Sequence, residues 1–197
     1  MPRPSQTDEQ RKKLLPIVCQ VFSERGYRRA TTAELAQRCG VRENILYRLW
    51  PDKKAMFLAA IDDIFESRAE MWAGILADTP NPGKASRRLV EYEAKHQGEF
   101  GFYRVVFTAL VETDDADIRK ALVSMYRRFH RLIWKQVEAG RGDSPGPKRL
   151  PADAAAWALI GLATVSNISR ELQLLGPRER EQVFAAVAEH LVTARGE

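Results

Sequence analysis

The sequence is poor in cysteine and has no long apolar run. Its 197 residues include only two cysteines, Cys19 and Cys39, which are too few for a disulfide framework and lack zinc-ligand spacing. The first ten residues have no apolar core of the kind found in signal peptides, and the most apolar run, residues 154–165, is too short to cross a bilayer. We therefore expect a soluble, cytoplasmic protein that is not exported.

The sequence also lacks a catalytic or metal-binding pattern. The three histidines, His96, His130 and His190, are isolated, and there is no Ser/His/Asp set, carboxylate pair or phosphate-binding loop. We expect no enzymatic activity, no cofactor and no metal. The alternative of a helical enzyme or metal-binding bundle with an incidentally basic end would need convergent titratable residues in the larger, C-terminal part, where we find none.

Positive charge is concentrated at the N-terminal end of the chain. Residues 1–60 contain 12 Lys and Arg against 6 Asp and Glu, whereas residues 61–197 contain 19 against 20. A local surplus of this kind favours binding to a polyanion, because neutralising phosphates supplies most non-specific affinity for nucleic acid. A merely soluble basic surface explains the pattern less well, since the rest of the chain is balanced.

Hydrophobic periodicity predicts an all-α protein of about nine helices, and no stretch alternates as a strand would. Three short helices are expected before residue 52, and a longer one carries an apolar stripe from Phe57 to Ile75. Proline within a helix removes a hydrogen bond, so Pro16 predicts a kink or a late helix start. The remaining helices are expected at about 84–97, 99–112, 115–139, 152–175 and 178–194.

The clearest functional signal lies between Thr31 and Trp50. Thr31 and Glu34 have the spacing of a capping box, in which the threonine caps the first turn and the glutamate returns to the cap amide. Gly40 permits the left-handed geometry that ends a helix, and a second short helix is expected over residues 43–49. Two short helices joined by a glycine-containing turn are typical of a helix-turn-helix, whose second helix enters the major groove.

Residues 11–60 resemble the tetracycline-repressor (TetR) family of bacterial regulators. The matching positions are Arg11, Leu14, Leu15, Phe22, Gly26, Tyr27, Thr31, Thr32, Leu35, Ala36, Gly40, Val41, Leu46, Tyr47, Trp50 and Lys53. The resemblance implies a helix-turn-helix DNA-binding domain over residues 1–52 and a helical ligand-binding and dimerisation domain over residues 53–197. It further implies a transcriptional regulator, most often a repressor that a small molecule releases from its operator.

The DNA contacts expected from geometry and from this resemblance fall into two groups. Contacts to phosphate are expected from Thr31, Thr32 and Lys53, which lie at helix starts. A further phosphate contact is expected from Tyr47, which resembles a tyrosine that binds phosphate in the family. Contacts to base edges are expected from Arg42, Glu43, Asn44 and Arg48. Arg42, Asn44 and Leu49 depart from the family pattern, so this chain is expected to read its own operator.

Two further predictions concern the C-terminal domain. The resemblance implies a homodimer joined through the last two helices, and pairing would double the number of bases read in a palindromic site. It also implies a pocket for a small apolar or amphipathic inducer, for which the candidate lining residues are Tyr103, Phe107, Met125, Phe129, Trp157 and Asn167. A purely intramolecular core remains the alternative for both sets of residues.

The sequence also allows an architectural DNA binder that responds to no ligand, which would show neither sequence preference nor ligand-induced release. Cys19 and Cys39 both lie in the DNA-binding region, so redox sensing is conceivable, although small buried thiols are the simpler interpretation. Within a bacterial cell, we expect the protein in the cytoplasm and associated with the nucleoid.

Overall fold

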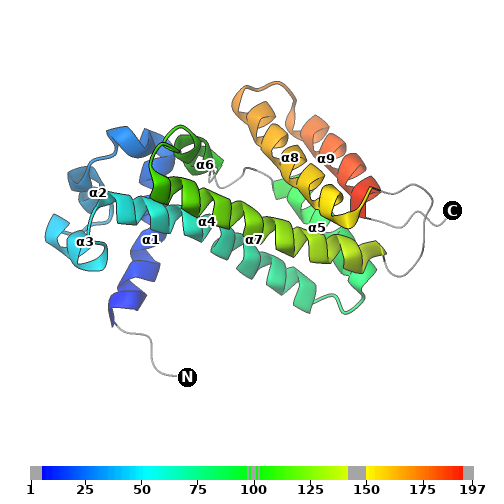
Figure 1. The fold of residues 1–197 in the computed structure, drawn as a ribbon, viewed down its shortest axis with the longest axis horizontal. Helices are drawn as coiled ribbons and strands as arrows, with labels where there is room; N and C mark the ends of the chain where they lie inside the picture. Colours follow the sequence, from blue (N-terminus) through cyan, green and yellow to red (C-terminus); the bar gives the residue numbers. More distant parts are fainter. Residues whose placement is uncertain (1–5, 97, 99–100, 102, 142–149, 193–197) are drawn as a thin grey trace. The chain divides into compact units, whose positions relative to one another are not determined.

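The fold is all-α, as the sequence predicts. A computed structural model describes residues 6–96, 98, 101, 103–141 and 150–192, and within these ranges there are nine helices and no strand (Figure 1). The helices are α1 (Gln6–Arg29), α2 (Thr32–Arg38), α3 (Glu43–Leu49), α4 (Lys53–Ala77), α5 (Pro82–His96), α6 (Tyr103–Leu110), α7 (Ala116–Arg141), α8 (Ala152–Glu171) and α9 (Pro177–Val192). The described helices include none that is long and apolar enough to span a membrane.

Short polar side chains begin several helices. Asp52 accepts a hydrogen bond from the backbone amide of Ala55 at 2.6 Å where α4 begins, and Asn81 has the same role before α5 at 2.9 Å. Asp115 accepts two amides of the first turn of α7, at 2.9 and 3.2 Å. These two bonds, the one from Ile118 above all, lower the pKa of Asp115. The caps satisfy amide groups that have no partner within a helix.

The first helix differs from the prediction. Helix α1 already includes Gln6 and continues through Pro16, so the expectation of a late start is wrong. The exposed proline lies among helical dihedral angles, and the non-helical residue is Gly26, with φ 74° and ψ 168°. A side chain is strained at this φ, which explains why glycine stands there. The last turn of α1 therefore points along a different direction from the rest.

Two other helix ends also differ from the prediction. Helix α8 ends at Glu171, four residues earlier than expected, because Gln173 takes a positive φ of 54°. Helix α6 begins at Tyr103, whereas the sequence predicts a start at residue 99; residues 99, 100 and 102 lie outside the described ranges.

The chain forms two compact units. The first comprises the described residues of Met1–Glu66 and Phe100–Met125, and therefore contains α1, α2, α3 and α6 with the first parts of α4 and α7. Its core holds a cluster of three rings: Phe57 lies 4.9 Å from Phe22 and 4.7 Å from Tyr27, measured between ring centroids. Phe22 and Phe57 are fully buried, so these rings anchor α4 to α1.

The second unit comprises the described residues of Ser67–Glu99 and Tyr126–Glu197. Its core is built from aliphatic side chains and one phenylalanine of α5, α7, α8 and α9: Ala94, Val137, Ala155, Leu159, Phe184, Ala188 and Val192. Gly140 marks a close approach, because a Cβ atom there would lie 3.0 Å from Ser86 and from Val192. These two units do not coincide with the predicted functional domains, which meet after residue 52. The functional boundary is defined by DNA contact and stays a prediction.

Candidate nucleic-acid interface

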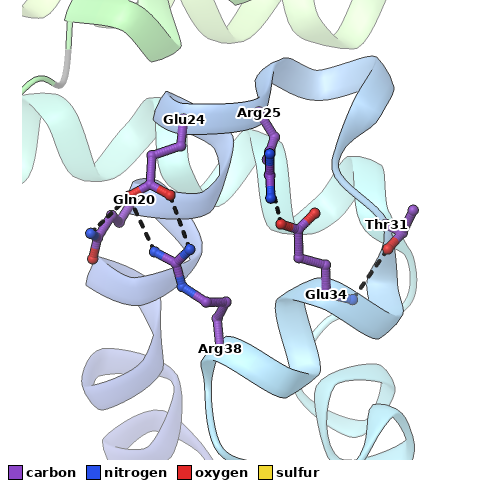
Figure 2. Close-up of polar contacts among 6 residues, drawn as sticks. All are labelled: Gln20, Glu24, Arg25, Thr31, Glu34 and Arg38. Carbon is purple, nitrogen blue, oxygen red and sulfur yellow. Dashed lines mark hydrogen bonds and ion pairs between the residues drawn. The ribbon is translucent and has the colours of Figure 1, made fainter.

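Helix α2 is capped by Thr31, as the sequence predicts. Thr31 has an extended backbone (φ −106°, ψ 153°), and its hydroxyl oxygen accepts a hydrogen bond from the amide of Glu34 at 3.2 Å (Figure 2). The second half of the predicted capping box is wrong. The carboxylate of Glu34 does not return to the cap amide but accepts a bond from Nε of Arg25 at 2.7 Å. An ion pair with the preceding helix thus replaces the local bond.

A second ion pair joins α1 to α2. Arg38 donates two hydrogen bonds to Glu24, at 3.0 and 3.1 Å, and Gln20 donates a third at 2.9 Å (Figure 2). The bonds from Arg38 and then from Gln20 lower the pKa of Glu24. Two-pronged pairs of this kind fix orientation as well as charge. Arg25 and Arg38 are therefore paired with carboxylates, so the positive surplus of this end of the chain comes from its other Lys and Arg residues.

The turn between α2 and α3 forms at Gly40, as predicted. Gly40 has φ 66°, the amide of Val41 donates to the carbonyl of Ala36 at 3.0 Å, and the amide of Gly40 donates to Gln37 at 3.1 Å. This pair of bonds is the Schellman arrangement, which ends a helix sharply and requires a left-handed residue. The turn thus sets the direction in which α3 leaves α2.

Helix α3 has one buried and one exposed face. Leu46 and Leu49 are fully buried on the inner face, and Trp50 is buried directly after the helix. All five residues predicted to contact DNA from this segment are exposed; they are Arg42, Glu43, Asn44, Tyr47 and Arg48. Arg42 occupies the N-cap position, where its side chain makes no capping bond, and arginine is not among the residues that usually cap a helix.

A chain of hydrogen bonds connects α2 with α3. The hydroxyl of Tyr47 donates to the hydroxyl oxygen of Thr32 at 3.1 Å, and the Thr32 hydroxyl donates to the carboxylate of Glu43 at 2.8 Å. Three of the predicted DNA-contacting side chains therefore lie within hydrogen-bond reach of one another. Arg48 is held from another side, since it donates to the side chain of Gln10 at 3.2 Å.

Two basic side chains have structural partners that sequence reasoning missed. Arg11 donates from Nε to the carbonyl of Leu49 at 2.7 Å and so fixes the end of α3. Lys53 donates to the carbonyls of Tyr27 and Ala30, both at 3.0 Å, and its ammonium lies 4.7 Å from the Tyr27 ring centroid. Because an ammonium has three donors, one remains for the predicted phosphate contact. These partners are 23 to 38 positions away, beyond the reach of local patterns.

The predicted ligand-binding residues are spread over both units. Tyr103, Phe107 and Met125 belong to the first unit, where Tyr103 and Phe107 contact each other edge to face at 5.8 Å. Phe129, Trp157 and Asn167 belong to the second unit. Trp157 is 47% exposed and stacks on His130 at 4.6 Å, and Asn167 has a buried Oδ1 without a hydrogen-bond partner among the described residues.

The second unit contains a cavity that none of these six residues lines. Its walls come from the last part of α4 and from α5, α7, α8 and α9; the lining residues are Trp72, Ser86, Leu89, Val90, Glu93, Ile133, Gln136, Val137, Leu159, Ala163, Phe184, Ala188 and Val192. The role of the six predicted residues as ligand contacts stays a prediction. Among the described residues, no three His, Cys, Asp or Glu side chains gather as a metal site would require.

Comparison with known proteins agrees with this geometry. Residues 19–60, which run from α1 to the first two turns of α4, match the family of bacterial regulatory proteins called the tetR family. The chain therefore contains the DNA-binding segment that is typical of the TetR family. TetR proteins are regulators rather than enzymes, in agreement with the predicted lack of enzymatic activity.

The curated relatives share only part of the chain. The nucleoid occlusion factor SlmA of Pasteurella multocida is 44% identical over 82 residues, which are 41% of this chain and 40% of that protein. SlmA of Haemophilus ducreyi is 41% identical over 64 residues, 32% of each chain. The match thus spans less than half the length of these TetR relatives.

Solved structures of the TetR fold match almost the whole chain. A putative transcriptional regulator from Saccharomonospora viridis, solved in complex with choline, has a TM-score of 0.77 at 20% identity and covers 95% of this chain and 100% of its own. A putative TetR-family regulator from Rhodococcus sp. has a TM-score of 0.78 at 15% identity, covering 94% and 100%. At these identities the likeness concerns the fold alone.

Proposed function

We propose that the chain is a sequence-specific DNA-binding transcriptional regulator of the TetR family, which acts as a homodimeric repressor and leaves a palindromic operator when a small molecule binds. The observation that carries this proposal is the two-faced helix α3. Its leucines are buried, while Arg42, Glu43, Asn44, Tyr47 and Arg48 are all exposed. A short helix held rigidly at both ends with an exposed polar face suits insertion into a major groove.

The exposed side chains supply complementary chemistry for DNA. Arginine can donate two bonds to guanine, asparagine can pair with adenine, and a carboxylate can accept from cytosine, so Arg48, Asn44 and Glu43 are assigned to base edges together with Arg42. Thr31, Thr32, Tyr47 and the remaining donor of Lys53 are assigned to phosphates. The first group would set the sequence preference and the second the register.

The exposed apolar face of α8 and α9 supports the homodimer. Trp157 and Val165 on α8 are 47% and 58% exposed, Leu172 directly after this helix is 62% exposed, and Val183 and Val187 on α9 are also exposed. Figure 1 shows these two helices side by side at the C-terminal end of the chain. An exposed apolar surface of this kind marks an interaction site, and a second copy provides the two recognition helices that a palindrome needs.

The repressor mechanism follows from the course of α4. This helix begins at Lys53, directly after the recognition segment, and ends at Ala77 in the second unit. We assign ligand binding to the C-terminal domain, where it would shift the start of α4 and change the spacing of the two recognition helices. A coupling of about 1–3 kcal/mol would lower operator affinity about 5- to 150-fold. Such a regulator works where the chromosome is, in the bacterial cytoplasm.

Selection of bound DNA from a random pool tests the proposal. The wild-type chain should enrich a palindrome, and Arg48→Ala should lose the preference at symmetric positions while retaining weak, salt-sensitive binding. Arg119→Ala removes an exposed arginine of α7 and serves as the matched control. If no palindrome is enriched, or if Arg48→Ala selects the same sequence as the wild type, the assignment of α3 as the recognition helix is wrong.

The dimer is tested by sedimentation velocity. Val165→Glu places a charge on the exposed face of α8 and should convert a dimer to a monomer with a correspondingly weaker affinity for the palindrome. Val111→Glu, in the turn after α6, changes a valine that is 71% exposed and should leave the dimer intact. A dimer that survives Val165→Glu would contradict the proposed interface.

A further inference from the structure

The cavity of the second unit is largely apolar but contains a small polar site. Its volume is about 80 Å³. Trp72, Leu89, Val137, Leu159 and Phe184 belong to its apolar lining, whereas the polar side chains that line it are those of Ser86, Glu93 and Gln136. A mainly apolar cavity with a few polar groups in its wall is typical of a small-molecule site.

Glu93 uses only one of its two oxygens for binding within the protein. Its Oε1 accepts from Nε1 of Trp72 at 2.7 Å and from Nη1 of Arg68 at 3.1 Å. The side chains of Arg68 and Glu93 are only 16% and 14% exposed, so the pair lies largely out of water. Oε2 accepts no hydrogen bond from the described residues. A carboxylate can accept about four hydrogen bonds, so the cavity wall offers an unused acceptor.

Gln136 adds an unused donor to the same wall. The hydroxyl of Ser86 donates to the backbone carbonyl of Gln136 at 2.9 Å, which satisfies Ser86. The side-chain amide of Gln136 makes no hydrogen bond among the described residues. An amide nitrogen carries two donors, so this side chain has donors left for a ligand. A ligand that bonds to both residues would use both groups.

We infer that the cavity binds an uncharged molecule with an apolar body and a hydroxyl head group, which donates to Glu93 Oε2 and accepts from the Gln136 amide. This inference rests on the proposed function, because it names the chemical class of the inducer. A hydroxyl is both donor and acceptor, whereas a carboxylate only accepts and an ammonium only donates.

Charge favours the same ligand class. Arg68 and Glu93 neutralise each other across 3.1 Å, so the site has no net charge to be balanced. A bound ammonium or carboxylate would bring one unpaired charge into an environment that is largely apolar, at a considerable desolvation cost. A neutral alcohol brings none.

The size of the cavity limits the body of the ligand. A dry cavity of about 150 Å³ accommodates benzene, and this cavity is roughly half as large. Because the cavity is partly open to solvent, a slender alkyl chain can enter it and extend beyond it, whereas a rigid ring must fit within its width. This leads to a matched set of six-carbon probes: 1-hexanol, hexylamine and hexanoate, which differ only in the head group.

Isothermal titration calorimetry on the full chain measures the three affinities. We expect 1-hexanol to bind at least about tenfold more tightly than either charged probe, since one hydrogen bond to a charged group is worth about that factor or more. Equal binding of the three probes, or tighter binding of hexylamine or hexanoate, would overturn the inference.

Glu93→Gln tests the named residue. The amide oxygen of the new side chain can still accept hydrogen bonds from Trp72 and Arg68. The amide nitrogen, in the position of Oε2, becomes a donor, and Arg68 loses its counter-charge. Hexanoate should therefore bind more tightly than 1-hexanol. Glu91→Gln, at an exposed position two residues earlier on α5, should leave the preference for 1-hexanol unchanged. Gln136→Leu retains the Arg68–Glu93 pair and should weaken 1-hexanol alone. If Glu93→Gln keeps the wild-type order of affinities, Glu93 does not bind the head group of the ligand.

Operator binding in the presence of 1-hexanol separates this inference from the proposed function. If 1-hexanol binds with the expected selectivity but the operator is not released, the site is confirmed and the repressor mechanism is wrong. If the chain binds its palindrome but the three probes bind with equal affinity, the DNA-binding function is confirmed and the proposed ligand class is wrong.

Discussion

Lys53 offers the sharpest test of how the DNA-binding unit is held together. Its ammonium donates to two carbonyls at the end of α1, those of Tyr27 and Ala30, both at 3.0 Å. These carbonyls belong to a helix end and lack partners within the helix. Lys53→Met retains the apolar stem, which extends toward the Tyr27 ring, and removes the charge together with both bonds. We expect this single change to loosen the start of α4.

The expected size of the effect follows from the contacts. A hydrogen bond to a charged group contributes about 1.5–3 kcal/mol, and a cation above an aromatic ring about 0.5–1 kcal/mol. Because the side chain is only half buried, solvent screening reduces these values, and we expect a total loss of roughly 2–3 kcal/mol. With a urea dependence of about 2 kcal/mol per molar, the unfolding midpoint would fall by roughly 1 M.

Urea unfolding, followed by circular dichroism, measures this change. Lys13→Met, at an exposed position of α1, is the control and should leave the midpoint within about 0.2 M. The salt dependence of operator binding tests the phosphate contact separately, since each lost contact reduces the slope by about 0.9. A midpoint for Lys53→Met equal to that of the wild type would refute the anchoring role, whatever the slope does.

Three further predictions use the same unfolding assay. Thr31→Ala should destabilise by about 1 kcal/mol through loss of the cap on α2, while Thr31→Asp should restore most of it; equal loss in both would contradict the capping role. Gly26→Ala should destabilise by about 1–2 kcal/mol because of its φ of 74°, whereas Gly74→Ala, in an open and exposed part of α4, should be neutral or stabilising. Burial and then the charge of Asp63 raise the pKa of the Cys19 thiol, so the folded chain keeps a proton that the unfolded chain loses above about pH 8.5. The stability contributed by this thiol is therefore present below that pH and is lost as the pH rises, by about 1.4 kcal/mol at pH 9.5. The free energy of unfolding of Cys19→Ala should therefore fall less between pH 7.5 and 9.5 than that of the wild type.

The sequence predicts those features that depend on neighbouring residues. The cap at Thr31 and the left-handed turn at Gly40 were recognisable because each is made within about five residues of chain. The partners in the ion pairs were not: Glu34 satisfies the spacing of a capping box, yet Arg25, nine positions earlier, binds its carboxylate. Pro16 was misleading for a related reason: its local cost to the helix is offset by tertiary packing of the buried face of α1, which carries Leu14, Val18 and Phe22.

The ligand site was the least predictable part. Aromatic residues such as Tyr103 and Trp157 drew attention by their type, but the cavity is lined mostly by aliphatic residues and by Trp72. Nothing in the sequence distinguishes its polar residues, Glu93 and Gln136, and only the packing of α5 and α7 places them on one cavity. Both cysteines prove to be buried, and burial raises the pKa of the Cys39 thiol as well. The simpler interpretation of these thiols is therefore the one that the structure supports.

The hydroxyl of Thr32 has a consequence for how this protein can change its target. The Thr32 hydroxyl donates its one hydrogen bond to the carboxylate of Glu43 and accepts a hydrogen bond from the hydroxyl of Tyr47. In the proposed complex, one of these neighbours reads a base and the other binds a phosphate. A substitution of Glu43 that alters the preferred sequence therefore also alters the orientation of Tyr47. A lineage that adapts to a new operator through this position must tune affinity and specificity together.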